Sequence, residues 1–241
     1  MKMQISLSIL EYESELSEQL SYLREPRALS EILRIIHSGK IYSVHIDIMR
    51  PPLIPDKTRF SVGLIRWLYS KLHDKIVLEI HLMTENPLSL IEEINEFIEE
   101  KERDKVVMIL QREAFSSEGE TIERLRAVKK DGYKIGISLN LPTPIESLTE
   151  QIVRSVDMVL LMTVPMGRGG QKYSNEATER IEYFHKRFPD VLIEVDGGIQ
   201  EKTILLVKKA GAKAVVVGSF LTRSRKLEES IKKLERKLRD Y

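Results

Sequence analysis

The chain has 241 residues, 42% of them hydrophobic and 31% charged, so it is long enough to bury the core of one large α/β domain. Its 38 Lys and Arg residues nearly balance its 37 Asp and Glu residues, which argues against recruitment to nucleic acid or to a membrane surface by charge. The absence of Cys excludes disulfides and thiolate metal ligands.

No apolar run reaches the roughly 18 residues that a spanning helix needs, and the start of the chain, Met1–Ile5, lacks the apolar core of a signal peptide. We therefore expect a cytoplasmic protein that has no membrane partner.

Short β-branched runs alternate along the chain with amphipathic, charged stretches. The expected strands are Gln4–Leu10, Ile41–Met49, Ile76–Met83, Lys105–Leu110, Tyr133–Leu139, Asp157–Val164, Val191–Asp196 and Lys213–Gly218. The clearest helical patterns are Glu13–Leu23 and Arg27–His37, which Pro26 separates, followed by Pro87–Glu100, Thr178–Phe188, Thr203–Ala210 and Lys226–Leu238. Eight strands that alternate with helices predict a single (β/α)8 TIM barrel over residues 1–241, in preference to an open doubly wound sheet.

Ionisable side chains interrupt the apolar runs near the ends of three expected strands. His45 and Asp47 lie two residues apart and so share one face of their strand, as Glu194 and Asp196 do on theirs. His81 lies near the end of the third strand, on one face with Met83. Functional residues of this barrel type gather at the carboxyl ends of strands. His45, Asp47, His81 and Asp196 are therefore predicted to hold one divalent metal ion, of zinc, iron, manganese or cobalt. His37, His73 and His185 fall in helical patterns and are expected at the surface.

Glycine-rich segments follow the last three expected strands. Gly197-Gly198 and Gly218-Ser219 come after strands seven and eight, where barrels of this type often bind phosphate through backbone N–H groups. Gly167-Arg168-Gly169-Gly170-Gln171 follows strand six and is typical of a loop that closes as a lid.

The order and spacing of these motifs resemble the ribulose-phosphate 3-epimerase family over nearly the whole chain. The family opens with Ser-Ile-Leu, as in Ser8–Leu10, and continues with His-x-Asp-x-Met and His-Leu-Met, as in His45–Met49 and His81–Met83. Further matches are Asn86-Pro87, Asn140, Thr143-Pro144, Met162, Val164, Gly167–Gln171, Val195–Gly198, Ala210–Ala212 and Gly218-Ser219.

The resemblance implies a metal-dependent sugar-phosphate 3-epimerase, whose substrate is a phosphorylated ketose and which forms a homo-oligomer. It implies that D-ribulose 5-phosphate and D-xylulose 5-phosphate are interconverted through an enediolate. It implies that His45, Asp47, His81 and Asp196 are metal ligands, and that Asp47 and Asp196 also act as the acid–base pair. The residues it implies for substrate binding are Ser8, Met49, Met83, Met162, Gly167, Gly169, Gly170, Gly197, Gly198, Gly218 and Ser219.

The sequence departs from the family pattern in several loops. Arg50-Pro51-Pro52 stands where the family has Asp-Gly, Gln111 replaces a His at the end of strand four, and Pro165–Arg168 replaces Asn-Pro-Gly-Phe. These changes leave open a ketohexose phosphate substrate such as allulose 6-phosphate, or a sugar-phosphate-binding relative without turnover. A barrel lyase or decarboxylase is disfavoured, because Asp47 is not followed by the Asp-x-Lys-x-x-Asp pattern of those enzymes.

Overall fold

Eight parallel strands close into a barrel in chain order, with β1 paired to both β2 and β8. The structure is a computed structural model that describes residues 3–19, 26–224 and 226–239. The strands are β1 Gln4–Ser8, β2 Ser43–Met49, β3 Val77–Met83, β4 Val106–Gln111, β5 Lys134–Leu139, β6 Met158–Met162, β7 Leu192–Asp196 and β8 Ala214–Val217. The predicted (β/α)8 barrel is confirmed, and the open doubly wound sheet is excluded because β8 pairs with β1.

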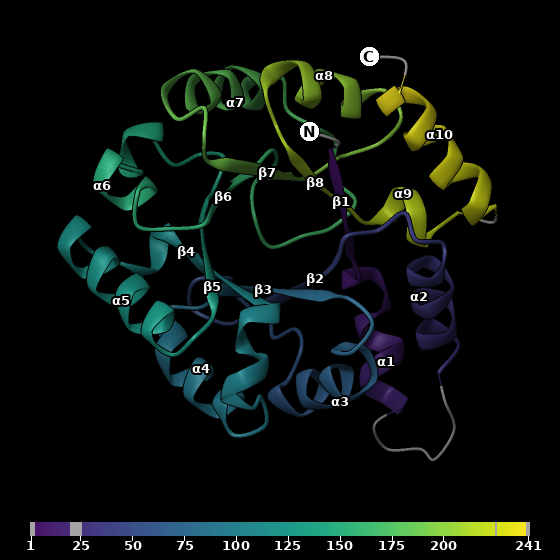
Figure 1. Cartoon of the computed structure of the whole chain (residues 1–241), viewed down its shortest axis with the longest axis horizontal. Coiled ribbons are helices and arrows are strands. Elements are labelled where there is room, and N and C mark those ends of the chain that lie inside the picture. The colour runs from purple at the N-terminus through teal and green to yellow at the C-terminus, as the bar shows by residue number, and fades with distance from the viewer. Residues whose placement is uncertain (1–2, 20–25, 225, 240–241) are drawn as a thin grey trace.

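Helices form a ring outside the strands (Figure 1). They are α1 Glu13–Gln19, α2 Arg27–His37, α3 Val62–Leu72, α4 Pro87–Asn95, α5 Glu118–Lys130, α6 Glu150–Val153, α7 Glu176–Arg187, α8 Thr203–Ala210, α9 Ser219–Thr222 and α10 Leu227–Arg239. Short 3-10 helices occupy Leu10–Tyr12, Glu100–Lys105, Arg112–Ala114 and Ile145–Ser147. No helix among these described residues is long and apolar enough to cross a lipid bilayer.

One predicted helix ends earlier than expected, and the end of another falls among residues that the structure does not describe. Pro87–Glu100 was expected as one helix, but α4 ends at Asn95, where the Phe97 N–H donates to the Ile94 carbonyl three residues back and so tightens the last turn. Ile98, beyond the end of α4, is still buried. The expected helix Glu13–Leu23 is described as far as Gln19, and its remaining residues lie outside the described part of the chain.

Side-chain caps fix where several helices begin. Ser61, Asn86, Ser117 and Thr149 each accept a hydrogen bond from the backbone N–H three residues further on, which satisfies one of the free donors at a helix start. Pro87 follows Asn86 at the first position of α4, where its fixed φ suits the helix and its missing N–H costs nothing.

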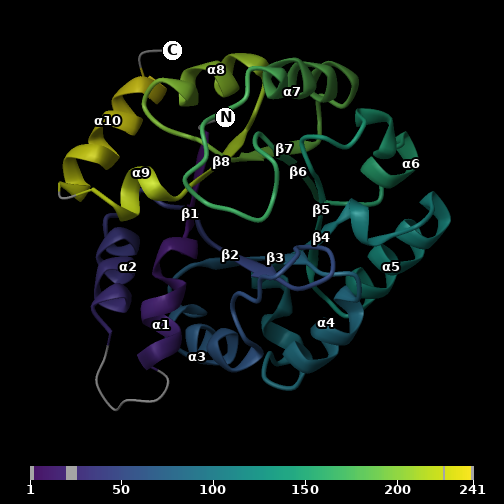
Figure 2. The same cartoon turned by 180° about the vertical axis from the view of Figure 1, so that it is seen from behind.

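The hydrophobic core has two layers. The larger layer lies between the strands and the surrounding helices and contains side chains such as Ile46, Leu64 and Ile193. A smaller cluster inside the barrel consists of Val107, Ile109, Met158, Leu160, Met162 and Val216. The loop between β6 and α7, green in Figure 2, crosses the opening of the barrel.

Candidate active site

Polar side chains on β2 and β3 occupy the interior of the barrel. Alternate residues of a strand point to the same side, so His45 and Asp47 of β2 point inward together, and so do Glu79 and His81 of β3. The register aligns Asp47 with His81 across the two strands. His45 and His81 are fully buried, and Asp47 is only 4% exposed, so each of these polar groups needs a partner inside the protein.

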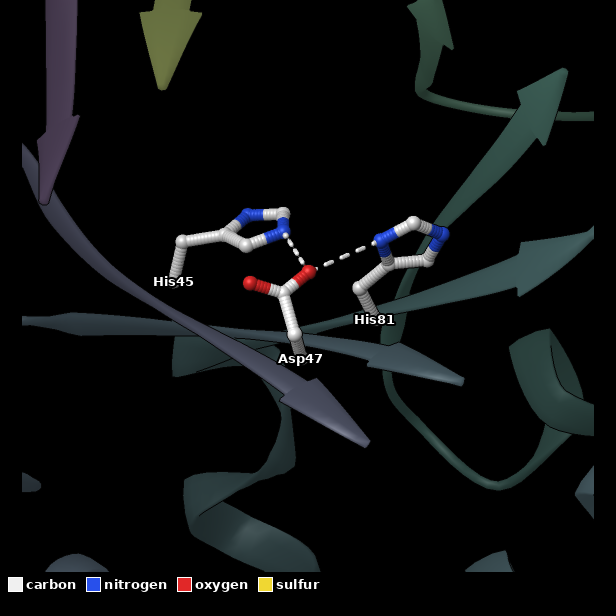
Figure 3. Close-up of side chains that lie close together, drawn as sticks. All are labelled: His45, Asp47 and His81. Carbon is white, nitrogen blue, oxygen red and sulfur yellow. Dashed lines mark hydrogen bonds and ion pairs between the residues drawn. The ribbon is translucent and has the colours of Figure 1, made fainter. Parts of the chain in front are cut away.

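Asp47 lies between the two imidazole rings (Figure 3). Its Oδ1 atom is 3.3 Å from His45 Nε2 and 3.3 Å from His81 Nδ1, and its Oδ2 accepts a hydrogen bond of 3.2 Å from the Ser8 hydroxyl. The three residues His45, Asp47 and His81 thus bring together one ligand atom each, all within 4.8 Å of one another. Three of the four predicted metal ligands therefore gather at one point.

The far side of each imidazole ring is held by a residue that the sequence analysis did not assign. His45 Nδ1 is 3.2 Å from Glu79 Oε2, and Glu79 in turn accepts a hydrogen bond of 2.5 Å from Ser6. His81 Nε2 is 2.7 Å from Gln111 Oε1. Partners of this kind orient histidine ligands in metal sites. One signal in the sequence could have pointed to Glu79. It lies two residues before His81, which places the two side chains on one face of β3.

Electrostatics separate the two aspartates of the site. Burial alone would raise the pKa of Asp47, but His45 and His81 hold it well below its usual range. Burial would lower the pKa of His45, whereas Asp47 and Glu79 raise it well above its ordinary value. Asp196, at the end of β7, has its pKa raised to about 7 by burial and by the negative charge of Asp47. The two carboxylates therefore differ in proton affinity, as paired acid and base groups do.

Asp196 lies at the same pocket as Asp47 but outside the cluster of three metal-ligand atoms. Both residues line a pocket that encloses about 590 Å³ of space, partly open to solvent. Glu194, two residues before Asp196, is 1% exposed and its Oε2 has no hydrogen-bond partner among the described residues. Burial, and then the charge of Glu79, raises the pKa of Glu194 well above its ordinary value.

All eleven residues that the resemblance assigned to substrate binding line this one pocket. They are Ser8, Met49, Met83, Met162, Gly167, Gly169, Gly170, Gly197, Gly198, Gly218 and Ser219. Met49 and Met83 also pack against Ile54 in a small cluster at the mouth of the barrel, so they have a structural role there besides. His45 and His81 are not part of the lining and lie beneath it.

Glycine is required where the chain turns after β7. Gly198 has φ +63°, and a Cβ atom on it would lie 2.3 Å from the backbone N of Tyr173. No other residue fits so close to the loop between β6 and α7 without moving it. Gly197-Gly198, directly after β7, and Gly218-Ser219, directly after the neighbouring β8, therefore form one glycine-rich edge of the pocket.

The loop of residues 165–171, predicted as a lid, is fastened at several points. Gln171 Nε2 donates to the carbonyl oxygens of Pro165 at 2.7 Å and Arg168 at 2.8 Å. Lys57 Nζ donates to the Gly167 carbonyl at 2.5 Å, which joins this loop to the one after β2. Met166 packs against the methionines of the pocket mouth, a contact that the sequence analysis did not anticipate.

The two arginines that depart from the family pattern occupy different places. Arg168 is exposed and lines the pocket. Arg50 is absent from the lining described, and its half-buried guanidinium donates to the carbonyl oxygens of Met49 and Phe60, each at 2.7 Å, and to that of Arg59. Arg50 therefore closes its own loop.

The residues present fit a divalent cation. His45 Nε2 is buried and has no hydrogen-bond partner among the described residues, although it faces Asp47 Oδ1 at 3.3 Å. Two imidazoles and carboxylate oxygens form a donor set that suits zinc, iron, manganese or cobalt. The fit rests on this nitrogen and on the three ligand atoms that lie within 4.8 Å of one another.

Comparisons with known proteins agree on one family. A model of the ribulose-phosphate 3 epimerase family matches residues 22–222. The chain is 29% identical over 203 residues to the ribulose-phosphate 3-epimerase of Schizosaccharomyces pombe, covering 83% of each chain. It is 31% identical to the cytoplasmic isoform of Oryza sativa subsp. japonica, covering 80% of each chain. It is also 31% identical to the Bacillus subtilis enzyme, covering 80% of this chain and 85% of that one.

Solved structures with the same architecture have more distant sequences. A 3-keto-L-gulonate-6-phosphate decarboxylase from Vibrio cholerae superposes with a TM-score of 0.67 at 10% identity, covering 100% of this chain and 99% of the other. A 3-hexulose-6-phosphate synthase from Salmonella typhimurium gives 0.65 at 16% identity, covering 99% of each. At such identities the likeness concerns the fold alone.

Proposed function

Since the chain belongs to the ribulose-phosphate 3-epimerase family, we propose that it interconverts D-ribulose 5-phosphate and D-xylulose 5-phosphate. It is accordingly an isomerase, and the substrate and the chemical steps are the parts that we propose. The observation that supports them most is the placement of Asp47 and Asp196 at one pocket, on strands β2 and β7, which β1 and β8 separate.

Inversion at C3 requires proton transfer on both faces of the carbon. We assign Asp47 to one face and Asp196 to the other, so that one carboxylate removes the C3 proton and the other carboxylic acid returns a proton from the opposite side. The intermediate between the two transfers is an enediolate. Met49, Met83 and Met162 would cover it with thioether side chains, which cannot donate protons to it.

The phosphate of the substrate would lie at the glycine-rich edge formed by Gly197-Gly198 and Gly218-Ser219. Backbone N–H groups at glycine turns approach an anion closely, and barrels of this type often hold phosphate after strands seven and eight. The loop of residues 165–171 would close over the bound sugar and exclude water. Ser8 would contact the substrate beside Asp47, to which its hydroxyl is hydrogen-bonded.

We also propose that His45, Asp47, His81 and Asp196 hold one divalent ion, of zinc, iron, manganese or cobalt. Asp196 would join the other three ligands from across the pocket. A cation at this place would stabilise the negative charge of the enediolate oxygens. Metal analysis of protein purified without chelators should find about one ion per chain, with occupancy lost in His45→Ala and His81→Ala and kept in the surface variant His37→Ala. Full occupancy in both site variants would contradict the ligand assignment.

A turnover assay across phosphorylated ketoses tests the proposed substrate. The purified protein, with its metal content measured, is supplied separately with D-ribulose 5-phosphate and with hexulose phosphates, including allulose 6-phosphate. We expect the highest kcat/KM for ribulose 5-phosphate. A higher kcat/KM for a hexulose phosphate would favour the alternative function, a 3-epimerase of a ketohexose phosphate. Binding without turnover of any substrate would indicate a non-catalytic sugar-phosphate-binding relative.

The cellular setting of this activity completes the proposal. We place the protein in the cytoplasm, because the rice relative is named as a cytoplasmic isoform. We expect neither a nucleic-acid nor a membrane partner. A homo-oligomeric state is part of the proposal and would be measured by light scattering.

A further inference from the structure

Gln111, the last residue of β4, lies fully buried between His81, a candidate metal ligand, and the acidic residue Glu113. Its Oε1 is 2.7 Å from His81 Nε2, and its Nε2 donates to Glu113 Oε2 at 2.5 Å. The position is one where the sequence differs from the family pattern, which has a His there. Gln111 therefore connects His81 to Glu113 through the two ends of its side-chain amide.

Glu113 dictates which way the Gln111 amide points. A carboxylate only accepts hydrogen bonds, so the Gln111 atom that faces it must be the NH2 group. Glu113 cannot turn away, because its Oε1 already accepts hydrogen bonds from the Asn140 N–H at 3.0 Å and from the Thr143 hydroxyl. The Gln111 carbonyl oxygen is consequently the atom presented to His81.

The orientation of Gln111 in turn decides where His81 carries its proton. An amide oxygen is an acceptor, so His81 Nε2 must donate, and in the neutral ring Nδ1 then carries a lone pair. That lone pair faces Asp47 Oδ1 at 3.3 Å, which is another acceptor. In that tautomer, a divalent cation placed between the two atoms would contact Nδ1 and Oδ1 together.

We infer that Gln111 is a positioning residue that keeps the proton of His81 on Nε2, so that Nδ1 is the metal-binding atom. The inference rests on the proposed metal site. A histidine in place of Gln111 would not impose this orientation by itself, because a neutral imidazole offers a donor at one nitrogen and an acceptor at the other. The amide fixed by Glu113 offers the acceptor alone.

Two substitutions separate this role from simple packing. Gln111→Met keeps an unbranched buried side chain and removes the acceptor for His81. Gln111→Glu keeps an acceptor there and gives up the bond to Glu113. Gln151→Met makes the same chemical change at an exposed glutamine of α6 and is the matched control. The readouts are the 15N chemical shifts of the His81 ring in metal-free protein, at a pH where the ring is neutral, and the Kd for Zn²⁺ or Co²⁺ by chelator competition.

In the wild-type protein and in Gln151→Met, the His81 spectrum should show Nε2 protonated and Nδ1 unprotonated. Gln111→Met should give a mixture of tautomers and a metal Kd weaker by about 10–100-fold, as is typical when the partner of a histidine ligand is removed. Gln111→Glu should restore the Nε2–H tautomer and most of the affinity. The tautomer is read without metal or substrate, so the result does not depend on whether the protein is an epimerase.

Either of two results would overturn the inference. One is a wild-type spectrum with the His81 proton on Nδ1, which remains measurable even if Gln111→Met does not fold. The other is a folded Gln111→Met protein that keeps the single Nε2–H tautomer and binds metal within twofold of the wild type. Failure of ribulose 5-phosphate turnover with these tautomer and affinity changes intact would instead count against the proposed substrate alone.

Discussion

Asp47 and Asp196 are the residues on which the proposed chemistry depends most. Positioned proton transfer contributes about 10²–10⁴-fold in rate, so Asp47→Asn and Asp196→Asn should each lower kcat by at least that range while the protein still folds. The exposed Asp190 provides a control, since Asp190→Asn should keep the wild-type kcat. Metal content must be measured in each variant, because loss of the ion would mimic loss of the base. A variant that keeps both its metal and its wild-type kcat would remove that aspartate from catalysis.

Arg168 is the arginine that we expect to contact the substrate. It is exposed at the pocket, and hydrogen bonds to charged groups contribute about 1.5–3 kcal/mol, so Arg168→Ala should raise KM about tenfold or more with a smaller effect on kcat. Arg154→Ala, at an exposed ion pair with Glu150, is the matched control for the loss of a surface arginine. Steady-state kinetics that give equal KM values for wild type and Arg168→Ala would show that the arginine makes no ground-state contact.

Strand periodicity in the sequence predicts which site residues share a face of one strand, but not which side chains they contact. The alternation of residues placed His45 and Asp47 on one face, and the structure brings them to His81. The partner of a side chain is decided by three-dimensional packing, which periodicity does not contain. The sequence showed that Gln111 replaces a histidine, but not that it lies against His81, 30 residues earlier. It likewise could not show that Arg50 turns back onto its own loop.

At the scale of elements, the loop after β2 depends on Arg50. Its guanidinium donates to three backbone carbonyls, so Arg50→Met should lower the free energy of unfolding by roughly 1.5–3 kcal/mol while leaving pocket charge unchanged. Urea denaturation of this variant beside Arg27→Met tests the prediction, since Arg27 is exposed and pairs with Glu31 within α2. An Arg50→Met protein with the same unfolding midpoint as Arg27→Met would contradict it.

Element boundaries were predicted well where a local signal marks them. The predicted bounds of Arg27–His37, which follows Pro26, and of Thr203–Ala210, which precedes Gly211, are those of α2 and α8. Pro87–Glu100 carries apolar residues at helical spacing throughout, yet α4 ends at Asn95. No proline or glycine interrupts that stretch, so no local signal in the sequence marks the end of α4.

At the scale of the whole molecule, the fold was predictable because strands and helices alternate eight times within 241 residues. Closure of the barrel brings β7 and β8 next to β1 and β2, and so assembles the pocket from both ends of the chain. Of the four proposed metal ligands, only Asp196 depends on that closure, because His45, Asp47 and His81 lie on the adjacent strands β2 and β3. Asp196 and Asp47 are 149 residues apart in sequence and share the pocket only in the closed barrel.

A metal ion at the centre of the barrel should stabilise the whole fold. An ion that binds only the native state at 1,000 times its Kd adds about 4 kcal/mol, which corresponds to a rise in Tm of roughly 8–16 °C for a chain of this size. Thermal unfolding with and without added Zn²⁺, Mn²⁺ or Co²⁺ after chelation measures this shift. His81→Ala should show little of it. An identical Tm in chelated and metal-loaded wild-type protein would contradict a metal site in the barrel.

Solvent exchange during a single turnover tests most directly whether two carboxylates on opposite faces of the substrate epimerise it at C3. Excess enzyme is mixed with D-ribulose 5-phosphate in heavy water, and the product is analysed by NMR before it can react again. If one carboxylate removes the C3 proton and the other delivers its own solvent-derived proton, the xylulose 5-phosphate should carry deuterium at C3. Product that wholly retains the original C3 hydrogen would contradict the assignment of Asp47 and Asp196 as two separate bases.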